Sequence, residues 1–260
     1  MSGFERILYD AADGVARITL NRPDKRNALD DRTVVELKAA LERAETDPAV
    51  RVLLLRGAGK DFCAGADLAQ IERIAAGAGA MENLDDAAGL GDLFIRMRRA
   101  RKPIVAAVHG HVFAGGAGLA TACDLVVARE DAAFGYPEVH LGFVPAMVMA
   151  LLRRAVGEKV AFELVARGDR ISASEALRLG LVNRVFPVES FDADAEAYAR
   201  ELASRSPSAV RLIKRLLYGM DGASFEEAIA RGAEVNVIAR MTEDTRRGVA
   251  RFLEQRQRRV

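Results

Sequence analysis

The 260-residue chain has only two cysteines and lacks any apolar stretch long enough to cross a membrane. Cys63 and Cys123 lie in apolar, small-residue stretches without a paired spacing, which predicts buried thiols in a reducing compartment and excludes a disulfide framework. The first residues include acids and lack an apolar core followed by a cleavage site. We therefore expect a soluble cytoplasmic protein that does not enter a membrane.

An excess of charge of either sign is also missing. The chain carries 38 basic and 37 acidic side chains, for a formal net charge of +1. This balance gives no global field to attract nucleic acid or an anionic membrane, so an anionic ligand must be recognised locally. The arginines near the C-terminus alternate with Glu243, Asp244 and Glu254 and lack interleaved aromatic residues. We expect a solvated helical end or a subunit contact there, and no nucleic-acid partner.

Motifs for metal, nucleotide or covalent chemistry are absent. His109 and His111 have no HExxH or paired-cysteine spacing around them, so no metal site is predicted. The glycine run at 115–118 lacks the third glycine of a dinucleotide loop, and no serine lies in a GxSxG turn. Cys63 has no evident base, so we interpret it as a packed small hydrophobic residue.

Strand and helix patterns alternate along most of the chain. Strands are predicted at 15–20, 52–56, 104–108 and 124–128, and a helix runs from Asp30 or Asp31 to Glu45. This alternation predicts an α/β domain with a mostly parallel sheet covered by helices. The glycine-rich stretch 75–91 predicts a mobile loop, with an interrupted helix as the alternative.

Only helical patterns follow Phe186 and Pro187. Ser206 before Pro207 and Ser224 with Glu227 mark two helix starts. An earlier capping box is predicted from Ser172 with Glu175, in a helix ending at Gly180. We therefore divide the chain into a sheet-containing body, residues 1–190, and a helical region, residues 191–260.

Two stretches share one plan: an apolar strand, then phenylalanine, then a small-residue turn that opens a helix. They are residues 52–68 (VLLLRGAGKDFCAGADL) and 104–119 (IVAAVHGHVFAGGAGL). Helix N-termini carry free N–H groups and a positive dipole end, so two facing ends can clamp one oxyanion. The alternative is that the small residues only let two helices pack tightly on the sheet.

Four motifs resemble the crotonase, or enoyl-CoA hydratase/isomerase, superfamily: NRPDKRNAL at 21–29, FCAGADL at 62–68, GHVFAGGAGLATACD at 110–124 and FGYPEVHLG at 134–142. They occur in the family's order over nearly the whole chain. The resemblance implies a spiral of repeated ββα units whose C-terminal helices assemble homotrimers or homohexamers. It also implies an acyl-CoA thioester substrate, with coenzyme A as part of the substrate and no other cofactor.

The resemblance also implies roles for individual residues. The backbone N–H groups of Ala66 and Gly115 would stabilise an enolate oxygen, and Glu138 would move the proton at the substrate α-carbon. The residues matched to coenzyme A binding are Lys25, Arg26, Ala28, Leu29, Ala64, Asp67 and Leu68. For Lys25 and Arg26 a solvated turn is the alternative.

The chain departs from the family's hydratase pattern at Gly118, where hydratases usually carry a second glutamate that helps position water. A single carboxylate fits a double-bond shift more simply than hydration, although Tyr136 or His140 could hold a water. The resemblance itself favours addition of water to a 2-enoyl-CoA, so hydratase and Δ3,Δ2-enoyl-CoA isomerase both stay open. A non-catalytic acyl-CoA binder or an RNA binder is the remaining alternative, and Glu138 argues against the former.

Overall fold

The computed structural model describes residues 3–67, 69, 72–73, 76–77 and 79–257. Among these residues, six strands form one sheet in the order β1-β2-β3-β4-β6-β9, in which β1 and β2 are antiparallel and the other neighbours are parallel. A second sheet has the order β5-β7-β8. The strands are β1 (Ile7–Ala12), β2 (Val15–Leu20), β3 (Val52–Gly57), β4 (Ile104–Val108), β5 (His111–Phe113), β6 (Leu125–Arg129), β7 (Ala133–Gly135), β8 (Ile171–Ser172) and β9 (Arg184–Phe186). The predicted α/β class with parallel strands is confirmed.

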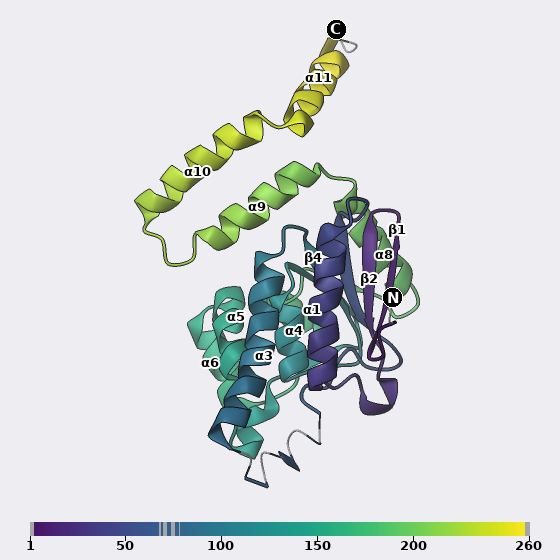
Figure 1. Cartoon of the computed structure of the whole chain (residues 1–260), viewed down its shortest axis with the longest axis vertical. Coiled ribbons are helices and arrows are strands. Elements are labelled where there is room, and N and C mark those ends of the chain that lie inside the picture. The colour runs from purple at the N-terminus through teal and green to yellow at the C-terminus, as the bar shows by residue number, and fades with distance from the viewer. Residues whose placement is uncertain (1–2, 68, 70–71, 74–75, 78, 258–260) are drawn as a thin grey trace.

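Helices cover both faces of the large sheet, which explains why β4 is apolar at every position. On one face, Leu53 and Ala106 belong to the core that α1 (Asp31–Thr46), α3 (Ala80–Arg99) and α4 (Gly115–Ala122) close. Figure 1 shows α1 and α3 side by side over this face. On the other face, Leu54 packs in a second core with α8 (Phe191–Ala203). The remaining short elements are η1 (Pro23–Lys25), η2 (Pro137–Leu141), α5 (Ala146–Val156), α6 (Glu158–Arg167) and α7 (Ala173–Leu179).

The prediction of a mobile loop over 75–91 is wrong from Ala80 onward, where α3 begins and continues unbroken to Arg99. Ala75 and Ala78 lie outside the described residues. Each glycine in a helix interior costs about 1 kcal/mol relative to alanine, which is why local propensity argued against a helix. Packing outweighs that cost, because Leu93, Phe94 and Met97 of α3 are buried in the core.

The predicted helix starts are confirmed at Ser206, whose side chain accepts a hydrogen bond from the Ala209 N–H, and at Ser224, which forms a complete capping box with Glu227. The box predicted at Ser172 is only half formed, because the Glu175 carboxylate binds Arg178 instead.

Helices follow one another from β9 to the end of the described chain, with α9 (Pro207–Gly219), α10 (Phe225–Arg240) and α11 (Glu243–Gln257) after α8. Figure 1 shows α10 and α11 beyond α9, away from the sheets. Lys214 fastens α9 to the body, because its buried ammonium donates to Asp124 Oδ2 (2.8 Å) and to the Met97 carbonyl (2.9 Å). None of the described helices combines the length and apolar composition needed to span a bilayer.

Candidate active site

The two repeated turns lie against each other. Hydrogen bonds pair the segments that precede them: the Cys63 N–H donates to the His111 carbonyl (3.1 Å) and the Phe113 N–H to the Cys63 carbonyl (3.0 Å). A Cβ on Gly65 would lie only 2.8 Å from the Ala114 Cβ. The resemblance between the two stretches thus corresponds to a physical pair of turns, each followed by the residue predicted to donate its N–H.

The Ala66 amide is held facing away from its neighbouring segment. The Leu29 N–H donates to the Gly65 carbonyl (2.8 Å), and the Leu29 carbonyl accepts from the Asp67 N–H (3.1 Å). In parallel pairing, the residue between two such bonded neighbours turns its own N–H and C=O outward. The Ala66 N–H consequently has no acceptor in the described part of the chain, and Ala66 is exposed.

Gly115 is the first residue of α4, where backbone N–H groups have no helical partner. Ala114 before it has φ 50° and ψ −124°, a region that costs a non-glycine residue about 1–3 kcal/mol. Bonds on both sides enforce this geometry, because the Ala114 N–H donates to Gly135 (2.9 Å) and its carbonyl accepts from Gly118 (3.0 Å). The strained backbone at Ala114 is therefore held in place, and it sets the direction of the N-terminus of α4.

Apolar side chains surround the Gly115 backbone. A Cβ on Gly115 would lie 3.7 Å from Leu29 Cδ1 and 3.9 Å from Leu90 Cδ2. Leu90 belongs to α3, in the stretch that the sequence had suggested was a loop. An amide in such surroundings interacts more strongly with a developing negative charge than it would in water.

Glu138 lies in η2 and carries a buried polar atom without a partner. Its Oε2 has no hydrogen bond within the described chain, and the residue is only partly exposed. Burial raises the pKa of Glu138, although a bond from its own backbone N–H opposes the shift. The adjacent Tyr136 is fully buried, which raises its pKa to about 12, and its hydroxyl lies 3.5 Å from the Thr121 hydroxyl. A carboxyl group whose pKa is raised by burial is suited to both taking and returning a proton.

The position of Gly118, where a second carboxylate was considered, is filled by neighbours. A Cβ on Gly118 would lie 2.5 Å from Val148 Cγ2 on α5 and 3.2 Å from Phe94 Cζ on α3. A glutamate does not fit there unless α5 or its side chains move. Val148 and Phe94 form an apolar wall that excludes a second carboxylate from this position, in addition to the glycine itself.

The residues predicted to bind coenzyme A form two adjoining segments. Lys25 and Arg26 are exposed on the η1 turn, while Ala28 and Leu29 are buried just beyond it. The Ala64 N–H donates to the Arg26 carbonyl (3.0 Å), which joins this turn to the Ala66 segment.

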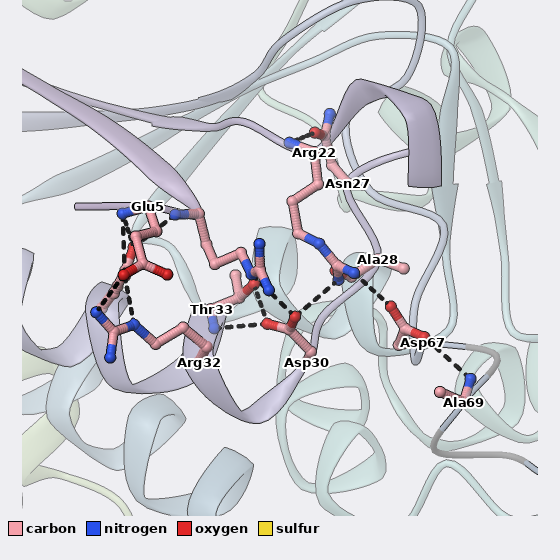
Figure 2. A network of polar contacts seen from close by, with 11 residues as sticks. Glu5, Arg22, Asn27, Ala28, Asp30, Arg32, Thr33, Asp67 and Ala69 are labelled. Atoms are coloured by element: carbon pink, nitrogen blue, oxygen red, sulfur yellow. Dashed lines mark hydrogen bonds and ion pairs between the residues drawn. The ribbon is translucent and has the colours of Figure 1, made fainter.

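The other two predicted contacts differ from each other. The Asp67 carboxylate is engaged by Arg22 (2.7 Å), as Figure 2 shows, and Leu68 lies outside the described residues. Sequence reasoning missed Arg22, whose only local signal is its place before Pro23 in the NRP turn. Of the two groups considered for holding water, Tyr136 is buried beside Glu138, and His140 is exposed with its ring over Gly168.

Comparisons with known proteins agree on one family. The sequence model of the enoyl-CoA hydratase/isomerase family matches residues 10–259. A 2,3-dehydroadipyl-CoA hydratase of Escherichia coli is 36% identical, covering 93% of both chains. A Thermus thermophilus protein, named provisionally as an enoyl-CoA hydratase, is 46% identical, covering 93% of this chain and 95% of its own. The chain belongs to the enoyl-CoA hydratase/isomerase family.

The structure agrees with that membership. A crystal structure of enoyl-CoA hydratase from Mycobacterium smegmatis superposes with a TM-score of 0.91 at 33% identity, covering 96% of this chain and 97% of the other. The predicted crotonase-type fold, including its C-terminal helices, is confirmed. The chain is thus an enoyl-CoA hydratase/isomerase family enzyme with the two paired turns, the buried carboxyl of Glu138 and the apolar wall at Gly118.

The described residues offer no other obvious chemistry. Searched over the described ranges, the structure has no group of three histidine, cysteine, aspartate or glutamate residues placed to hold a metal ion. Both cysteines are buried, and burial raises the pKa of Cys63 to about 12, so its thiol stays protonated and unreactive at neutral pH.

Proposed function

We propose that this family member moves the double bond of a 3-enoyl-CoA to position 2, with Glu138 as its single acid and base. The Glu138 carboxylate takes a proton from C2, and the electron pair forms an enolate whose charge rests on the thioester oxygen. The same carboxyl group then returns the proton to C4 as the double bond forms between C2 and C3. The step is balanced, because the substrate gains and loses one proton.

The amides of Ala66 and Gly115 are the proposed partners of the enolate oxygen. Support comes from the contact between their turns and from their N–H groups, which have no acceptor in the described chain. Loss of one donor of this kind typically lowers kcat by about 100- to 1000-fold.

The observation that carries the choice of reaction is the filled space at Gly118. Hydration requires a water to be held and activated besides the proton transfer at C2, whereas a double-bond shift needs only one group that takes and returns a proton. Val148 and Phe94 occupy the place from which a second carboxylate would act. Hydration of a 2-enoyl-CoA is the second candidate, favoured by relatives named hydratases, including crotonyl-CoA hydratase of Syntrophomonas wolfei.

Substrate pairs test the proposal directly. Purified enzyme is incubated separately with 3-hexenoyl-CoA and 2-hexenoyl-CoA, and products are separated by chromatography. We expect 2-hexenoyl-CoA from the first substrate, and loss of that activity in Glu138→Gln. Rapid formation of 3-hydroxyhexanoyl-CoA from the second substrate, without a double-bond shift in the first, would favour the hydratase instead.

We also propose that the tail helices join copies of this chain into a homotrimer or homohexamer. Large apolar side chains are exposed along them, including Ile213 and Leu217 on α9, Phe225 and Ile229 on α10, and Phe252 on α11. A monomer would leave this apolar surface in water. Light scattering on the eluting protein should give three or six times the 28.1 kDa chain mass, and a monomeric mass would refute the assembly.

A further inference from the structure

Arg22 is a largely buried arginine that connects two segments of the candidate site. Its guanidinium donates to the Ala28 carbonyl (2.6 Å) and to Asp67 Oδ2 (2.7 Å), and only 13% of its side chain is exposed. Figure 2 shows the guanidinium between these two partners. The planar fork of an arginine suits two such simultaneous bonds, which a lysine ammonium cannot reproduce in the same geometry.

These two partners flank the backbone pairing that orients Ala66. Ala28 precedes Leu29, whose N–H and carbonyl form hydrogen bonds with the two residues on either side of Ala66. Asp67 follows Ala66 directly. Arg22 therefore ties together the two segments whose register turns the Ala66 N–H outward. If these segments separate, the direction of that N–H is no longer fixed.

The base of the Arg22 side chain is itself held in place. The Arg22 N–H donates to Asn27 Oδ1 (2.9 Å), and the Asn27 N–H returns a bond to the Arg22 carbonyl (2.8 Å). The Asn27 side chain is buried and donates to the carbonyls of Ala58 (2.9 Å) and Asp61 (2.8 Å). Arg22 thus starts from a turn fastened to the loop after β3, and it can transmit that rigidity to Asp67.

The charge on Asp67 persists under ordinary conditions. Burial alone would raise the pKa of Asp67, but bonds from the Ala69 N–H (3.0 Å) and from Arg22 outweigh burial and lower it. Arg22 also lies 3.3 Å from Asp30, the residue that caps α1 through the Thr33 N–H. At neutral pH, Arg22 and Asp67 therefore form an ion pair. Asp30 also holds Arg22, and the Ala69 N–H also holds Asp67.

We propose that Arg22 is a positioning residue, whose fork between Ala28 and Asp67 fixes the direction of the Ala66 N–H toward the thioester oxygen. The inference rests on the function proposed above. Because a misplacement of about 1 Å at a reacting group can cost about 100-fold in rate, loss of this fork should lower kcat. It should lower kcat more than it raises KM, because Arg22 is covered by Ala28 and Asp67 and acts on the site only through them.

The test compares Arg22→Gln and Arg22→Lys with a matched control, Arg6→Gln. Arg6 binds the same Asp30 carboxylate (3.2 Å), whereas among the described residues the arginine bonds to Ala28 and Asp67 come from Arg22. We expect kcat to fall roughly 10- to 100-fold in Arg22→Gln with KM within about twofold, by analogy with misplaced catalytic groups. Arg22→Lys should be intermediate, and Arg6→Gln should keep the wild-type kcat.

Two readouts separate positioning from general loss of stability. A dimethylaminocinnamoyl-CoA chromophore absorbs at longer wavelength when its carbonyl is polarised, and this shift should shrink in Arg22→Gln alone. Amide hydrogen exchange at Leu29 and Asp67, whose N–H groups form the bonds on either side of Ala66, should accelerate in Arg22→Gln and not in Arg6→Gln when read by mass spectrometry. Unchanged exchange at Leu29 and Asp67, or equal kcat losses in Arg22→Gln and Arg6→Gln, would overturn the inference.

Failure of the underlying function gives a different result. If the wild-type enzyme neither turns over an enoyl-CoA nor shifts the chromophore, the proposed function itself is wrong and the catalytic role of Arg22 falls with it. The exchange measurement would then still report whether the fork orders the Ala66 backbone, so the two failures are distinguishable.

Discussion

Substitution of Gly118 by alanine tests whether its space is truly filled. The added Cβ would lie 2.5 Å from Val148 Cγ2, whereas non-bonded carbons prefer about 3.5–4.0 Å, so the neighbours must move by about 1 Å. Such overpacking typically costs about 1–3 kcal/mol. The higher helix propensity of alanine offsets about 1 kcal/mol of this. We expect Gly118→Ala to lower the free energy of unfolding by up to about 2 kcal/mol, the difference between these two effects.

A double-mutant cycle with Val148→Ala makes this prediction specific. Val148→Ala alone removes the clashing methyl groups from a buried position and should cost about 2 kcal/mol through the cavity it leaves. In the double variant the new methyl at position 118 occupies that cavity, so the combined cost should be smaller than the sum by about 1 kcal/mol or more. Urea unfolding followed by circular dichroism measures all four proteins. Additive costs in the double variant would refute the steric argument.

Three further predictions concern charge. Because burial raises the pKa of Glu138, the stability that this group contributes at low pH is lost as pH rises through that pKa. Glu138→Gln should therefore unfold at a higher urea concentration than wild type at pH 8 but not in acid. Wild-type kcat should fall as pH drops through the same pKa, because the carboxylate becomes protonated. Exchange of Lys25 and Arg26 for glutamine should raise KM for acyl-CoA with little change in kcat, and an unaltered KM would reject their role. Lys214→Met should cost about 3 kcal/mol by leaving the Asp124 carboxylate without its buried ammonium partner, and a wild-type unfolding midpoint would contradict this.

Local sequence signals predicted the framework of the fold because they report local physics. The apolar stretches at 52–56 and 104–108 became buried parallel strands, and Asp30, Ser206 and Ser224 cap the helices they were expected to begin. The region from Ala80 was predicted wrongly for the same reason, since its glycines weaken a helix locally. Only contacts distant in sequence, such as Gly91 near Met147 on α5, show why α3 continues.

The candidate site also has some features that local sequence signals predict and others that depend on contacts distant in sequence. The paired turns could be predicted from two similar stretches, because each carries its own strand, glycines and helix start. Arg22 and Val148 could not, because their roles depend on Asp67 and Gly118, which are distant in sequence and meet them only in the folded chain. That Glu138 Oε2 lacks a hydrogen-bond partner among the described residues is likewise a property of its surroundings and not of the PE motif.

The central claim is that one carboxyl group takes a proton from C2 and returns it to C4. The most direct measurement supplies 3-hexenoyl-CoA carrying deuterium at C2 to the enzyme in ordinary water and locates the label in the product by NMR. A single base shielded from solvent predicts 2-hexenoyl-CoA with part of the deuterium transferred to C4. A product without any deuterium at C4, or a hydrated product in place of the shifted double bond, would contradict the account.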